Sequence, residues 1–166
     1  MLKKLILVLL MLAPVGMFAQ DKFAYVNAEE VFSKMPELKD VESQLLAKRE
    51  QIKGILDGIQ TEHATLMEKF RNDTTQLSEA ILLDRQKQIS DLESRYETYM
   101  RSSQEELEKL RVSLVTPLQE KLGKAIKDVG DENGYTYILN SVALLYWNAN
   151  AVDVAPKVKA KLGIAI

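Results

Sequence analysis

The sequence predicts an α+β protein in which a long antiparallel α-helical coiled-coil hairpin projects from a small β body that oligomerisation completes. Apolar residues recur at intervals of seven between residues 38 and 66, on a background of Glu, Lys, Arg and Gln. A polar segment at 71–75 separates this stretch from a second helical one, and short aromatic, β-branched segments lie on either side of the pair. A narrow apolar seam is typical of coiled coils, and short β-branched runs are typical of strands.

Residues 1–20 have the features of a secretory signal peptide. Lys3 and Lys4 precede an apolar run over residues 5–15, and small residues follow it near a cleavage point. A retained membrane anchor is the alternative, but the run is shorter than the roughly 20 residues that cross a bilayer. We therefore expect an exported, periplasmic protein with no stable membrane insertion after cleavage. Residues 21–166 then form a single domain, with 21–36 and 117–166 as the body and 37–116 as the arm.

Composition excludes several classes of function. The 166 residues include no Cys and one His, so a disulfide framework, thiol catalysis and Cys-ligated zinc are ruled out. Removal of the two signal-peptide lysines leaves 20 basic against 24 acidic side chains, a net charge of −4. This balance argues against a nucleic-acid partner.

The predicted body begins with a strand over residues 22–27. Asn27 and Glu30 have the spacing of a capping box, which predicts a short helix from Ala28 to about Lys34. Pro36 fits the first turn of a new helix, because its missing N–H has no partner there.

The first arm helix follows from a heptad pattern. Its apolar residues at intervals of seven are Leu38, Leu45, Ile52, Ile59 and Leu66. The intermediate seam positions are assigned to Val41, Lys48, Ile55, Glu62 and Lys69.

The polar segment 71–75 predicts the tip of the hairpin near 71–77, and a second helix should run from about Leu77 to Val129. Pro117 lies inside this run, so we expect a kink or a break there. Gly134 should end the helix. Segments 135–139 and 142–147 then predict two strands paired as a hairpin, and Pro156 starts a last short helix.

A chain that puts about ninety residues into a hairpin retains little sequence for a core of its own. The strand segments carry more apolar surface than a three-stranded sheet with free edges could bury, so we expect copies of the chain to pair through them. The candidate residues of this oligomer body are Phe23, Tyr25, Val26, Tyr137, Leu139, Leu145 and Trp147. A ligand site at Trp147 is the alternative interpretation for that side chain.

The chain resembles the Skp, or OmpH-like, periplasmic chaperones. The similar segments are spread over the mature chain. Near its start they are 22–27, Val31, Phe32, Pro36 and Glu37. In its second half they are 117–126, 133–135, Leu145, Tyr146 and 152–154. The resemblance implies a homotrimer whose helical arms hold unfolded outer-membrane proteins in a central cavity.

Two features depart from that family. Ala155 stands where the family usually has a capping Thr, and residues 37–129 hold 15 Lys and Arg against 18 Asp and Glu, whereas well-known members are strongly basic. Lipopolysaccharide binding is therefore not carried over to this chain.

An arm that binds unfolded chains needs apolar or flexible side chains that are partly exposed to solvent. The candidate client contacts are Met67, Phe70, Leu77, Leu82, Leu83, Tyr96, Tyr99 and Met100. Packing between the two helices is the alternative for each of them.

The sequence offers no converging catalytic set and no cofactor site. His63 lies one residue beyond the predicted seam, where a solvated or packing role is expected, and the sequence contains no Walker-type or dinucleotide-binding glycine motif. We therefore predict an ATP-independent holdase chaperone that is not an enzyme and has no cofactor. A coiled-coil spacer or scaffold of the cell envelope with one fixed partner is the alternative.

Overall fold

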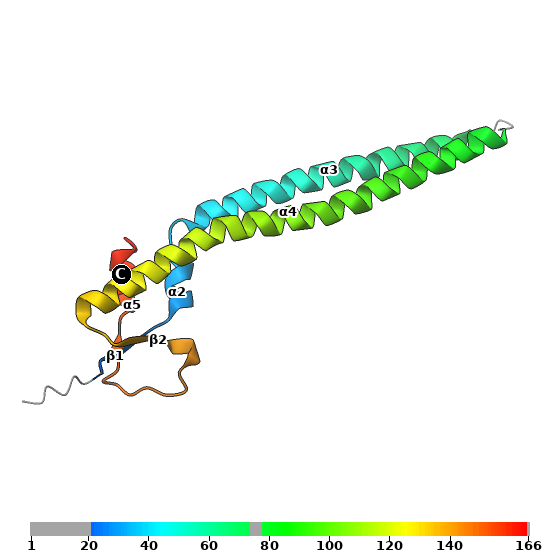
Figure 1. The fold of residues 1–166 in the computed structure, drawn as a ribbon. Helices are drawn as coiled ribbons and strands as arrows, with labels where there is room; N and C mark the ends of the chain where they lie inside the picture. The colour runs from blue at the N-terminus through cyan, green and yellow to red at the C-terminus, as the bar shows by residue number, and fades with distance from the viewer. Residues whose placement is uncertain (1–20, 74–77, 166) are drawn as a thin grey trace, which may run out of the picture.

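The computed structural model describes residues 21–73 and 78–165, and it confirms the predicted α+β class with a long helical hairpin on a small β body. A long hairpin of two helices extends from a small body that holds a three-stranded sheet and two short helices (Figure 1). In chain order the elements are β1 (Phe23–Val26), α2 (Ala28–Ser33), α3 (Leu38–Asn72), α4 (Glu79–Asn133), β2 (Tyr137–Asn140), the 3₁₀ helix η1 (Ser141–Ala143), β3 (Val152–Asp153) and α5 (Ala155–Lys161).

The sheet has the order β2-β1-β3, and both outer strands run parallel to β1. The predicted hairpin between 135–139 and 142–147 is therefore wrong. The Asn140 side chain accepts a hydrogen bond from the Val142 amide and starts η1, so the chain leaves the sheet directly after β2. It returns only at β3, where Tyr25 pairs with Asp153.

The two faces of β1 have different environments. Ala24 and Val26 are buried on the inner face, whereas Phe23 and Tyr25 lie on the outer face, where Phe23 is exposed. The inner face packs against α2, α5 and the end of α4. The buried residues of this core are Ala24, Val26, Val31, Met35, Leu122, Ala125, Val129, Val154, Ala155, Val158 and Leu162.

Asn27 caps α2 as predicted. Its side-chain oxygen accepts a hydrogen bond from the backbone N–H of Glu30 at 3.0 Å. The Glu30 carboxylate accepts from the ammonium groups of Lys34 at 2.7 Å and Lys159 at 3.0 Å. Glu30 thereby links α2 to α5. Pro36 lies two residues before α3 rather than in its first turn.

The Glu30 ion pairs predict a specific loss of stability in acid. Hydrogen bonds from Lys34 and then Lys159 lower the pKa of Glu30 to about 2, from an ordinary value of 4.5. The folded state thus favours the carboxylate, and the stabilisation is complete above pH 4.5 and lost as the pH falls towards 2. Urea denaturation of the protein and of Glu30→Gln should give midpoints that differ above pH 4.5 and converge below it.

A matched control for this experiment is Glu29→Gln, a change at an exposed neighbour in the same helical turn. Its midpoint should stay close to that of the unmodified protein throughout the titration. A Glu30→Gln difference that persists unchanged at pH 2 would contradict a charge-based role for Glu30.

Helix α4 continues through Pro117, so the predicted break is absent (Figure 1). It ends after Asn133, and Gly134 adopts the left-handed conformation with φ 64° that closes the helix, as predicted. The amide of Tyr135 donates to the Gly130 carbonyl at 3.0 Å and satisfies one of the last free acceptors.

Replacing Pro117 with Ala should stabilise the arm. The substitution restores an amide donor inside α4 and removes the ring's clash with the preceding turn, and a Pro in a helix interior costs up to about 3 kcal/mol. Pro117 is exposed, so no buried packing is lost. We expect a higher urea midpoint by far-UV circular dichroism, and little change for Gln119→Ala, at an exposed position nearby. A lower midpoint for Pro117→Ala would show that the ring has a stabilising contact of its own.

The seam of the arm is displaced from the predicted heptad after Ile52. Ile52 and Ile59 are buried as expected. The positions between and beyond them are filled by the partly buried Leu56, His63 and Phe70, in place of the predicted Ile55, Glu62 and Lys69, which are exposed. The seam passes from Ile52 to Leu56, a spacing of four residues where the heptad predicts three. This shift brings the apolar Leu56 and Phe70 into the seam and leaves the charged Glu62 and Lys69 in water.

Candidate functional site

The outer half of the arm exposes large apolar side chains far from the body. Four of the predicted contacts, between 38% and 62% exposed, are Met67, Leu82, Leu83 and Met100. Thioether and aliphatic groups that stay in contact with water are available to bind other apolar chains. The predicted contact Leu77 lies outside the described residues.

The three predicted aromatic contacts are partly buried between the helices. The Arg85 guanidinium lies over the Phe70 ring, 4.8 Å from its centre. Gln60 donates a hydrogen bond to the Tyr96 hydroxyl at 3.1 Å. Phe70, Tyr96 and Tyr99 therefore contribute to the contact between α3 and α4 and leave only part of each ring at the surface.

The structure also exposes apolar residues of the arm that the candidate set omits. These are Leu46, Ile55, Ile81 and Val112. Ile81 is the clearest case, because it begins a run of three consecutive apolar residues with Leu82 and Leu83. Successive residues point in directions about 100° apart on a helix, so a narrow seam cannot bury all three. That run was the signal in the sequence that could have identified Ile81.

Ion pairs between the helices hold the arm in register. Four such pairs join α3 or the residues that flank it to α4. They are Glu37–Lys121, Lys48–Glu106, Glu62–Arg95 and Asp73–Arg85. The Lys48 ammonium lies 2.7 Å from the Glu106 carboxylate and lowers the pKa of Glu106. Three of these pairs have at least one exposed partner, whereas Asp73–Arg85 is partly buried. Exposed pairs add little stability, so they mainly specify which residues lie opposite one another.

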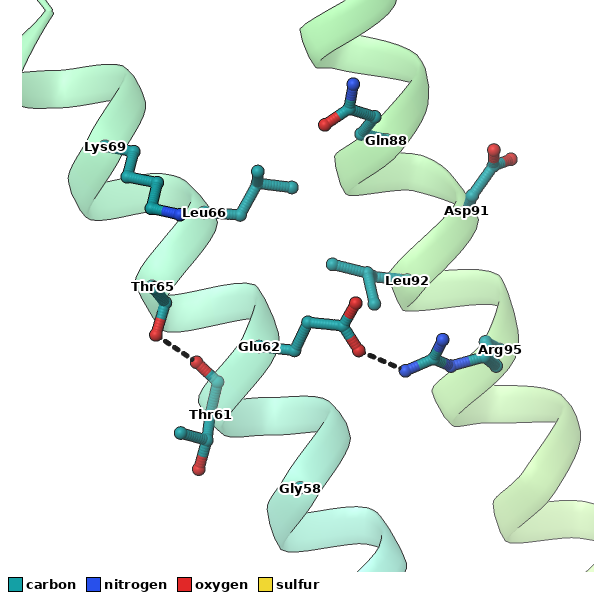
Figure 2. Close-up of a pocket in the computed structure, with 10 residues that line it drawn as sticks. All are labelled: Gly58, Thr61, Glu62, Thr65, Leu66, Lys69, Gln88, Asp91, Leu92 and Arg95. Atoms are coloured by element: carbon teal, nitrogen blue, oxygen red, sulfur yellow. Dashed lines mark hydrogen bonds and ion pairs between the residues drawn. The ribbon is translucent and has the colours of Figure 1, made fainter.

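A groove of about 680 Å³ runs along the outer half of the arm beside one of these pairs. Figure 2 shows Leu66 and Leu92 pointing toward each other from α3 and α4, and the Glu62–Arg95 pair crossing the groove below them. Lys69 and Asp91 add charges of both signs to its walls. An apolar ligand would have to displace hydrated charges here, so this groove is a poor site for one.

A second groove of about 380 Å³ also lies between α3 and α4. Its lining residues are Ile59, Gln60, His63, Leu92, Glu93, Tyr96 and Glu97. His63 Nε2 lies 3.6 Å from Glu93 Oε1, too far for a hydrogen bond.

Two features are absent from the described residues, a metal-binding cluster and a long apolar helix. Across residues 21–73 and 78–165, no three His, Asp or Glu side chains come together in a way that could hold a metal ion. Within the same ranges, no helix is both long and apolar enough to cross a bilayer.

The body presents an aromatic face at the other end of the molecule. Phe23 and Tyr25 of β1 pair with Tyr137 and Leu139 of β2, so the four side chains share the outer side of the sheet. The Phe23 and Tyr137 rings stack 5.3 Å apart, and Trp147 lies 5.4 Å from the Tyr25 ring. We call these five residues the aromatic face.

Two further candidates of the oligomer body differ in environment. Leu145 is fully exposed in the segment between η1 and β3. Val26 is buried on the inner side of β1, within the protomer's own core. A large exposed apolar surface on a soluble protein generally marks an interaction site, and the aromatic face with Leu145 meets that description.

The architecture is that of a long-armed α+β protein, with a helical hairpin on a small three-stranded body and apolar surface exposed at both ends. The chain belongs to the OmpH-like outer membrane protein family, whose model matches residues 22–162. A crystal structure of an OmpH-like protein from Caulobacter crescentus, described as a candidate outer membrane chaperone, has the same fold with a TM-score of 0.75. The match spans 87% of this chain and 85% of that one at 16% sequence identity. A search of curated proteins finds no match.

Proposed function

We propose that the protein is an ATP-independent holdase chaperone of the periplasm that binds unfolded outer-membrane proteins and prevents their aggregation. The observation that carries this proposal is the exposed apolar set Met67, Leu82, Leu83 and Met100, displayed on an arm away from the body. Membership of the OmpH-like family and the predicted signal peptide support the same conclusion.

The absence of a nucleotide-binding motif from the sequence favours passive binding and release. A client would then stay bound according to its affinity for the arm and leave as it folds or inserts elsewhere. No catalytic step is part of this function.

We further propose that the aromatic face joins copies of the chain into a homotrimer. Stacked rings such as Phe23 and Tyr137 leave one side in water in the single protomer, and association would bury that side. Several arms around a common body would then enclose a space for the client. The mass of the mature protein in solution, measured by light scattering, should be three times that of one chain.

The direct test is suppression of aggregation. A urea-unfolded outer-membrane β-barrel protein is diluted into buffer with and without the mature protein, and light scattering is recorded. One trimer per client should abolish most of the scattering without ATP. Unchanged scattering, together with selective binding of one folded envelope protein, would instead support a coiled-coil spacer or scaffold.

A further inference from the structure

We infer that the groove of about 380 Å³ on the arm is a side-chain pocket for unfolded clients, selective for an aromatic or large aliphatic residue flanked by Lys or Arg. This inference rests on the proposed holdase function and adds a sequence preference to it. We call the site the acidic groove, and its residues are Ile59, Gln60, His63, Leu92, Glu93, Tyr96 and Glu97.

The acidic groove lies on the opposite side of the arm from the groove in Figure 2. Gln60 and Glu62 are two residues apart on α3, about 200° around the helix, and they reach Tyr96 and Arg95 of α4 respectively. The two grooves therefore flank the same seam, and Leu92 contributes to both. A ligand in the acidic groove therefore need not disturb the Glu62–Arg95 pair, which lies in the groove of Figure 2.

The floor of the acidic groove is apolar and already ordered. Ile59 and Leu92 are buried in the seam, and the hydrogen bond from Gln60 to the Tyr96 hydroxyl fixes the aromatic ring at one end. The volume is large enough for one aromatic side chain. Insertion would cover apolar surface without a conformational change of the arm, which reduces the entropic cost of binding.

The rim of the acidic groove carries negative charge without a strong cationic partner. Glu93 and Glu97 are one turn apart on α4 and both exposed. Among residues 21–73 and 78–165, the Glu97 carboxylate makes no hydrogen bond or ion pair, and Glu93 has only the distant His63. The buried Nε2 atom of His63 has no hydrogen-bond partner either. The exposed carboxylates of Glu93 and Glu97 can accept hydrogen bonds from the N–H groups of a Lys or Arg side chain.

Charge complementarity therefore identifies the occupant. The groove in Figure 2 contains Arg95 and Lys69 beside its carboxylates, whereas the acidic groove is lined by carboxylates and no Lys or Arg. The mature chain is also acidic overall, with 24 acidic against 20 basic side chains. An apolar residue inserted on the floor with a basic neighbour at the rim satisfies both features of the site.

The test uses three synthetic peptides of equal length and the full mature protein, purified without a polyhistidine tag. One peptide contains a central Phe flanked by Lys, the second replaces the Lys residues with Glu, and the third keeps Lys but replaces Phe with Ser. Because the chain has a single His, the imidazole resonances of His63 report directly on the acidic groove. We expect the first peptide to shift these resonances at concentrations where the other two do not.

Fluorescence anisotropy of the labelled first peptide then measures affinity. Glu93→Gln combined with Glu97→Gln should weaken binding by about tenfold, the effect of losing two exposed ion pairs. A matched control, Glu50→Gln combined with Glu120→Gln, makes the same change of net charge at exposed positions outside the groove and should bind like the unmodified protein.

The outcomes separate this inference from the proposed function. Suppressed aggregation with no His63 shift, or equal losses in the test and control variants, would overturn the acidic groove and leave the holdase proposal standing. Absence of both peptide binding and suppression would overturn both. A His63 shift that depends on protein concentration without peptide would show that a second copy of the chain occupies the groove, which also contradicts the inference.

Discussion

A variant that lacks residues 49–105, with Lys48 joined to Glu106 through a short Gly-Ser turn, is expected to lose all suppression of client aggregation while its body stays folded. The two ends can be joined because the Lys48 ammonium lies 2.7 Å from the Glu106 carboxylate across the arm. The deletion removes Met67, Leu82, Leu83 and Met100 but none of the body core. Light scattering of a urea-diluted outer-membrane protein should match that of the client alone, with the near-UV circular dichroism of Tyr and Trp retained.

A milder deletion provides the matched control for arm length. Removal of residues 53–59 and 97–103 shortens each helix by one heptad at the same level of the hairpin. It keeps three of the four exposed contacts, Met67, Leu82 and Leu83, and removes Met100. This variant should retain most of its suppression. Full suppression by the variant without residues 49–105 would place client binding on the body and contradict the proposed role of the arm.

The arm was predictable because its information is local. Ile52 and Ile59 fall seven apart and are buried, and Gly134 ends α4 as the sequence indicates. The cap of α2 in the body, Asn27, is local in the same way. The displacement of the seam to Leu56 depends on which side chains α4 presents opposite α3, and a repeat in one helix does not contain that information. The continuity of α4 through Pro117 was not predicted either, because a Pro inside a helical pattern is typical of a kink or a break.

The body was harder to predict because its strands pair over long sequence separations. Segment 142–147 has strong β propensity, yet β1 pairs with β2 and β3, both in parallel, and Leu145 lies outside any strand. Propensity measures how well a residue suits a half-buried sheet and does not identify its neighbour. Only the two-residue β3 completes the sheet, and nothing in its two residues distinguishes it from a loop.

The exposure of the candidate contacts was predictable for some residues and not for others. Met67 and Leu82 are exposed as expected of contacts, whereas Tyr96 is partly buried and bonded to Gln60. Whether an apolar side chain beside a seam is covered depends on the rotation of both helices, which a single-helix pattern does not specify. His63, expected outside the seam, lines the acidic groove for the same reason.

Val158→Asp is expected to unfold the body and, with it, to remove assembly. Val158 is a residue of α5 and has no exposed surface. It packs in the core that joins α5 to α2, α4 and β1. A carboxylate there would be buried without a cation, which typically costs about 3 to 5 kcal/mol. Small domains are stabilised by only about 5 to 15 kcal/mol in total, so a body of this size has little margin. Near-UV circular dichroism from Tyr135, Tyr137 and Trp147 should weaken, and light scattering should report single chains.

Ala160→Asp tests whether the effect of Val158→Asp comes from burial or from charge on α5. Ala160 is exposed and lies two residues further along the same helix, so the same carboxylate is added in water. Its free energy of unfolding should change by less than about 0.5 kcal/mol. If both variants kept the trimer mass and suppressed aggregation equally, the packing of α5 would be unnecessary for assembly. If both variants lost the trimer mass, charge on α5 rather than the packing of the core would control the association of the chains.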